Sequence, residues 1–178
     1  MTVLAISYQG TIFAIMNDMT NKETYRYNST EVAKYIVASA NERHISINIT
    51  KVQKLLYIAY GVFLAIRECR LTNEHPQAWP YGPVFPTTRN KLLKVDLYAI
   101  SKQDDDLHEL QTDGDLNDLI ELVFRSFGTW SAAQLTDWSH GENTPWQRVV
   151  SEEHFKWGNQ IPDEYISSYF KSILRSNE

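Results

Sequence analysis

The stretch that decides the fold is residues 48–66, NITKVQKLLYIAYGVFLAI. The side chain of Asn48 or Thr50 can accept a hydrogen bond from a free amide at a helix start, so a helix is expected to begin there. Its apolar residues lie on nearly every face, a pattern typical of a central helix surrounded by others. The stretch therefore predicts a mostly α protein: a compact multi-helix domain around a buried central helix, with a small β element.

Helical spacing of apolar residues predicts further helices on both sides of this one. Each expected helix also has a recognisable start or stop signal in the sequence. The expected helices are residues 29–42 after Asn28 or Ser29, residues 116–127 ending at Gly128 as a left-handed cap, a helix after the capping box Ser131-Ala132-Ala133-Gln134, a short helix capped by Asn143 or Thr144 with Pro145 in its first turn, and residues 163–174 after Pro162.

The stretch from Trp79 to Pro86, WPYGPVFP, interrupts the helical pattern. Its prolines lack an amide donor and its glycine favours turns, so a shaped loop is expected. A helix over residues 87–94 should follow, and residues 95–100 are expected to pair as a short strand. The acidic run at residues 104–106 is expected to be a hydrated loop.

Residues 1–28 form a separate N-terminal extension in this interpretation, and residues 29–178 form the helical domain. Residues 3–16 are almost uncharged, with Gln9-Gly10 between two apolar runs. This pattern allows a short hairpin or an apolar helix, and the hairpin is preferred. Residues 17–28 are polar and are expected to be a connector.

The bulk composition restricts the partners and the compartment. A net charge of −5 and a pI near 5.5 disfavour direct binding to a phosphate backbone. Cys69 is the single cysteine, so no intramolecular disulfide can form, which fits a reducing compartment. No secretory leader or membrane-spanning run is evident, so a soluble, cytoplasmic protein without membrane contact is expected.

Candidate catalytic groups are few. His140-Gly141-Glu142 matches the H-x-E of zinc deaminases, but the required downstream Pro-Cys-x-x-Cys is missing. Residues 104–106 with His108 could ligate a hard cation, although a short acidic run is more often a hydrated loop. Cys69 has no flanking nucleophile signature. We therefore expect no catalytic residue, no metal and no cofactor, and a protein that is not an enzyme.

Tryptophan and tyrosine are abundant, with five and ten copies. Both residues enrich cores and protein interfaces alike, because each combines a large apolar area with a polar tip. For any one of them, packing in the core is the preferred interpretation.

Four motifs occur in order along the chain. They are Gln53-Lys54-Leu55-Leu56-Tyr57, Ala78-Trp79-Pro80-Tyr81-Gly82-Pro83-Val84, Ser131-Ala132-Ala133-Gln134-Leu135, and Ser139-His140 with Pro145-Trp146. Together they resemble the Panacea domain family of SocA-like, phage-associated proteins, over roughly residues 29–172.

The resemblance implies an antitoxin of a toxin–antitoxin system that neutralises a protein toxin by direct binding, the toxin being encoded by a neighbouring gene. The alternative is a proteolytic adaptor that delivers its bound toxin to a AAA+ protease, and an enzyme with an unrecognised site is a weaker one. The family carries no catalytic residues. Its motif residues, mainly architectural and also candidate partner contacts, are Gln53, Lys54, Tyr57, Trp79, Tyr81, Gly82, Pro83, His140, Pro145 and Trp146.

These motif residues suggest how the domain is held together. Tyr81-Gly82-Pro83 are expected to fix a rigid loop against the central helix, and Trp146 to pack back onto that loop. His140 is expected to tie two helix ends by hydrogen bonds.

Overall fold

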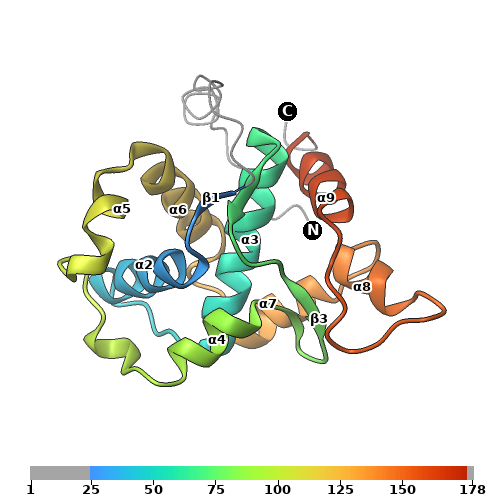
Figure 1. Ribbon diagram of the computed structural model, residues 1–178, viewed down its shortest axis with the longest axis horizontal. Coiled ribbons are helices and arrows are strands. Elements are labelled where there is room, and N and C mark those ends of the chain that lie inside the picture. The colour runs from blue at the N-terminus through green and yellow to red at the C-terminus, as the bar shows by residue number, and fades with distance from the viewer. Residues whose placement is uncertain (1–24, 176–178) are drawn as a thin grey trace.

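A computed structural model describes residues 25–175 of the chain, and the hairpin expected over residues 3–16 lies outside this range. The described part is mostly helical, as predicted, with only short strands (Figure 1). Its α-helices are α2 (Ser29–Glu42), α3 (Ile49–Arg67), α4 (Pro86–Leu92), α5 (His108–Thr112), α6 (Gly114–Phe127), α7 (Ala132–Ser139), α8 (Pro145–Val150) and α9 (Asp163–Arg175), and its strands are β1 (Tyr25–Tyr27), β2 (Arg70–Thr72), β3 (Gln77–Trp79) and β4 (Gly82–Val84).

Helix α3 is the predicted central helix. It begins after Asn48, whose side chain accepts a hydrogen bond from the Lys51 amide at 2.9 Å, and its residues 51–65 are all buried. Helices α2, α6, α7 and α9 pack around it (Figure 1). It has the length and apolar composition of a membrane-spanning helix, but most of it is buried inside the fold, as is normal for a core helix.

The strands form two small pairs. Strands β3 and β4 form an antiparallel hairpin that begins at Gln77 and includes the first part of the proline-rich stretch, which the sequence predicts to be a shaped loop. Strand β1 pairs in parallel with β2, so the last residues of the expected polar connector are part of a sheet instead. The Tyr27 hydroxyl donates a hydrogen bond to Asp113 at 2.7 Å, which ties β1 to the start of α6.

The prediction of a strand over residues 95–100 is wrong. Leu97–Ala99 form a 3-10 turn, because the Asp96 side chain accepts a hydrogen bond from the Tyr98 amide at 3.0 Å. Such a local cap competes with strand pairing. The acidic run is also ordered differently from a free loop: Asp105–Leu107 form a second 3-10 turn, and Asp106 makes an ion pair with Lys34 at 2.5 Å.

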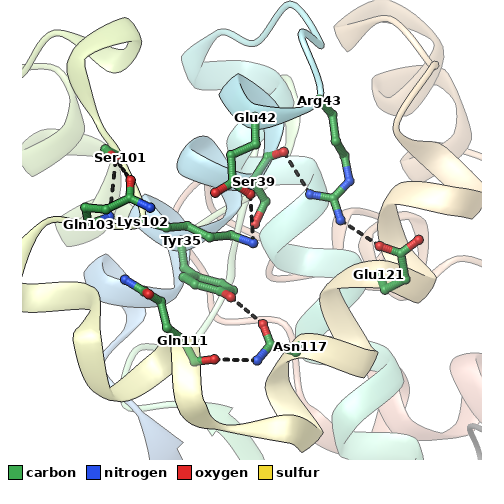
Figure 2. Close-up of polar contacts among 10 residues, drawn as sticks. All are labelled: Tyr35, Ser39, Glu42, Arg43, Ser101, Lys102, Gln103, Gln111, Asn117 and Glu121. Carbon is green, nitrogen blue, oxygen red and sulfur yellow. Dashed lines mark hydrogen bonds and ion pairs between the residues drawn. The ribbon is translucent and has the colours of Figure 1, made fainter.

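Polar contacts hold residues 97–112 against α2 and α6 (Figure 2). The Tyr35 hydroxyl donates to Asn117, whose side-chain amide donates to the Gln111 carbonyl at 2.9 Å. The Lys102 ammonium lies 4.9 Å from the centre of the Tyr35 ring and 3.0 Å from a carboxylate oxygen of Glu42. These contacts explain why the irregular segment has a defined path.

The predicted helix boundaries in the second half of the chain are largely confirmed. The capping box at Ser131 and Gln134 is present, and Thr144 caps α8. Helix α6 ends before Gly128 as expected, but Gly128 has φ −58°, so the left-handed cap is wrong. A glycine is required there by space, because a Cβ would lie 2.5 Å from the Phe124 carbonyl oxygen.

Candidate functional site

Most of the motif residues gather where the β3–β4 hairpin meets three helices. Gln53 and Lys54 come from α3, His140 from the end of α7, and Trp146 from α8. Tyr57 lies one turn further along α3 and packs edge-on against Phe170 of α9, with ring centroids 5.8 Å apart. We call the meeting point of β3, β4, α3, α7 and α8 the hairpin joint.

Two side chains of helix α3 bind backbone atoms of the hairpin and of the residue that follows it. The Lys54 ammonium donates a hydrogen bond to the Pro83 carbonyl at 3.0 Å, and the Gln53 side-chain oxygen accepts one from the Phe85 amide at 2.7 Å. Lys54 is only 1% exposed and Gln53 only 2%. Two adjacent polar side chains therefore fix β4 and its following residue to the core, as the predicted rigid loop requires.

Gly82 lets the hairpin approach its supports closely. Its φ is +96°, and a Cβ there would lie 2.6 Å from the Ser139 hydroxyl oxygen and 2.7 Å from the Lys54 ammonium nitrogen. Both the backbone conformation and the available space therefore demand glycine. The hairpin is wedged between α3 and α7.

Helix α8 closes the joint from the other side. The Trp146 indole nitrogen donates a hydrogen bond to the Trp79 carbonyl at 2.9 Å, and Pro145 is buried in the first turn of α8. The His140 ring stacks on the Trp146 ring with centroids 3.8 Å apart and planes 11° apart. The His140 Nε2 atom is buried without a hydrogen-bond partner among the described residues, so this atom does not form the expected hydrogen-bonded tie, and the ring contacts α8 by stacking.

Comparisons with known proteins place the motif residues within a known family. Residues 52–147 match the family model for the antitoxin SocA-like Panacea domain, a span that contains all ten motif residues. The chain belongs to this family. A relative, Antitoxin SocA of Caulobacter vibrioides (strain NA1000 / CB15N), is 29% identical over 157 residues, covering 79% of this chain and 80% of the relative. No solved structure matches the chain significantly.

Burial determines the protonation of the two basic side chains at the hairpin joint of this Panacea domain. Burial lowers the pKa of Lys54 to about 7, and no carboxylate within residues 25–175 forms an ion pair with it. Burial, and then the nearby Lys54 charge, lower the pKa of His140. An amine with a lowered pKa can act as a base or nucleophile, but Lys54 is too buried to reach a substrate.

Two other kinds of candidate chemical group, metal ligands and the cysteine thiol, can be assessed in residues 25–175 of the Panacea domain. Among the described residues, no three His, Cys, Asp or Glu side chains are placed to hold a metal ion. Cys69 is half-buried, and burial raises the pKa of its thiol, which favours the less reactive protonated form.

Two aromatic side chains at the hairpin point outward. Tyr81 is 75% exposed in the hairpin turn, unlike its buried neighbours Gly82 and Pro83. Trp157 is 57% exposed and lies beside Phe155 and Trp146, with ring centroids 4.8 and 6.4 Å away. Sequence reasoning missed Trp157, because a lone tryptophan in a polar segment carries no periodic signal.

Proposed function

We propose that this protein is an antitoxin that neutralises a protein toxin by binding it directly. The observation that carries the proposal is membership of the antitoxin SocA-like Panacea domain family, together with similarity to Antitoxin SocA over most of both chains. We infer that the partner is a protein toxin encoded by the neighbouring gene, and that both act in the cytoplasm.

The hairpin joint supports a binding role over a catalytic one. The motif residues Lys54 and Trp146 use their side-chain donors to bind the hairpin backbone, and Gly82 allows the hairpin to pack closely against its supports. We therefore infer a protein that works without a cofactor, a metal or a catalytic residue of its own. Residues 29–178 would act as one binding unit, and residues 1–28 as an extension to it.

The proposal can be tested by growth of a bacterial host that expresses the protein encoded next to this chain. Neutralisation predicts that this protein arrests growth, that co-expression of this chain restores growth, and that toxin abundance on an immunoblot stays constant. The same cultures are grown in a host without its AAA+ proteases. Rescue that disappears in this host, with toxin loss in the parent host, would favour the proteolytic adaptor, and a lack of rescue in both hosts would refute the antitoxin role.

A further inference from the structure

We propose that the toxin docks in a groove along the first half of α2 and places a lysine or arginine side chain in the acidic end of that groove. The groove lies outside the hairpin joint, between β1, α2 and the segment of residues 91–113 (Figure 1). We call it the α2 groove. The inference rests on the proposed antitoxin function and adds the binding surface and the chemistry of the partner.

Two cavities form the α2 groove. The first, of about 470 Å³, is lined by five carboxylates: Glu31, Asp105, Asp106, Glu109 and Asp113. The second, of about 310 Å³, has Leu92 and Val95 in its wall. Asn28, Glu31 and Asp106 line both cavities, so the two are continuous.

The acidic cavity keeps a negative charge after its own cations are counted. Arg26 lies 3.5 Å from Asp113, and Lys34 forms an ion pair with Asp106. The other three side chains form no ion pair and accept no hydrogen bond within residues 25–175, and they are Glu31, Asp105 and Glu109. The free amides at the start of α2 offset only about half an elementary charge. The cavity therefore favours a cation.

The placement of the carboxylates indicates which kind of cation fits. Within residues 25–175, no three His, Cys, Asp or Glu side chains are placed to hold a metal ion. An ammonium group has three N–H donors and a guanidinium group has five, so either can reach carboxylates that are too dispersed for a metal ion. Cavities that take ligands have volumes of roughly 300–1,000 Å³, so a basic side chain of the partner can enter this one.

The other end of the α2 groove is apolar and exposed. Val95, which lines the second cavity, is 42% exposed, and Leu93 and Tyr98 of the same segment are 54% and 74% exposed. Exposed apolar side chains that gather on one segment are typical of interaction surfaces. Lys91 also lines this end and disfavours a second cation there. The bound part of the toxin therefore needs an apolar side chain at the Val95 end and a basic one at the Asp105 end.

The walls of the α2 groove are fixed to the fold. The Tyr27 hydroxyl donates a hydrogen bond to Asp113 at 2.7 Å. The Asn41 side-chain amide donates to the carbonyls of Leu97 and Ile100, each at 2.9 Å. A surface that is ordered before binding loses little conformational entropy when the partner docks.

The charge of the partner is tested by isothermal titration calorimetry of purified variants with the purified protein encoded by the neighbouring gene. Asp105→Lys/Glu109→Lys should weaken binding by roughly tenfold or more at low salt, because it places like charges opposite each other. Asp105→Asn/Glu109→Gln keeps the shape of both side chains and should weaken binding by roughly threefold to tenfold.

Glu142→Lys/Glu153→Lys is the matched control for overall charge. It changes the net charge as much as Asp105→Lys/Glu109→Lys does, at two exposed carboxylates outside the α2 groove. Its affinity should stay within about threefold of wild type, because charges at the rim or outside an interface contribute little. Far-ultraviolet circular dichroism and thermal melting verify that each variant is folded.

The apolar end is tested with Tyr98→Ala, which should weaken binding by roughly tenfold. Tyr81→Ala is its control, because Tyr81 is 75% exposed on the hairpin turn, and this variant should stay within about threefold of wild type. A loss of binding for Tyr81→Ala with none for Tyr98→Ala would place the docking surface on the hairpin and refute the α2 groove.

Unchanged or tighter binding of folded Asp105→Lys/Glu109→Lys would overturn the basic chemistry of the partner. An equal loss in Glu142→Lys/Glu153→Lys would show that overall charge, and not the α2 groove, attracts the toxin. In each of these cases wild type still binds, so the antitoxin function stands. If wild type does not bind at all, the proposed function fails and this inference fails with it.

Discussion

Adjacent residues of the hairpin turn have opposite environments. Gly82 is buried with φ +96° against Ser139 and Lys54, whereas Tyr81 is 75% exposed. Gly82→Ala should therefore lower the free energy of unfolding by about 3 kcal/mol, because the substitution combines backbone strain with overpacking. Chemical denaturation measures this change. Gly114→Ala is the control: no atom lies within 4 Å of its Cβ position, and its stability should change by less than about 1 kcal/mol.

His140 contributes through its ring face. The ring stacks on Trp146 at 3.8 Å, while its buried Nε2 atom lacks a hydrogen-bond partner among the described residues. His140→Phe should therefore be neutral or slightly stabilising, because stacking remains and an unsatisfied polar atom is removed. His140→Ala should cost about 1–2 kcal/mol. If urea denaturation shows that His140→Phe and His140→Ala lower the free energy of unfolding equally, the imidazole nitrogens contribute to stability.

Lys54 should make stability depend on pH. Its pKa is about 7 in the folded state, against a usual value of 10.5. Between these values the unfolded chain binds a proton that the folded chain lacks, so stability should rise with pH from about 7, by at most ~1.4 kcal/mol per pH unit. Denaturation of wild type and Lys54→Met from pH 6 to 9.5 isolates this effect. A difference between the two proteins that does not change with pH would contradict it.

Helices α3 and α9 approach each other most closely at Gly61. A Cβ on Gly61 of α3 would lie 2.1 Å from the Phe170 ring of α9. Gly61→Ala should therefore destabilise the fold by about 3 kcal/mol. Phe170→Leu leaves a smaller side chain opposite, so the double variant should lose less stability than the sum of the two single variants. Strict additivity in this cycle would show that the two positions do not meet.

Helices were predicted more reliably than strands because their signals are local. The caps at Asn28, Asn48, Ser131 and Thr144 lie within three residues of the amides they bind. Strands of three residues carry too little alternation to be recognised, and β1 depends on a partner far along the chain. The 3-10 turn over residues 97–99 depends on a single cap, Asp96, in an otherwise apolar stretch whose pattern favours a strand.

The candidate site could be predicted in part. The motifs predicted a rigid loop fixed against the central helix and the return of Trp146 onto that loop, and the structure contains both, although the loop is part of the β3–β4 hairpin. The sequence did not indicate that Tyr81 is exposed while Gly82 is buried, because that difference arises from the tertiary contacts of the turn. Trp157 is placed near the hairpin by the pairing of residues 158–160 with β3. This pairing joins segments that are far apart in the sequence, so no local pattern predicts it.

Residues 25–175, the part of the chain that the structure describes, form a helical scaffold that presents the rigid β3–β4 hairpin, and the proposed role of the protein is to inactivate a toxin by binding to it. Direct neutralisation differs from delivery to a protease in one respect: it needs no third component. It should therefore work with two purified proteins.

The decisive measurement is the activity of the purified toxin after mixing with increasing amounts of this protein, in the absence of any protease. Direct neutralisation predicts that toxin activity falls to background at a fixed molar ratio while the toxin itself remains intact on a gel. A toxin that keeps its full activity at saturating antitoxin would contradict direct neutralisation.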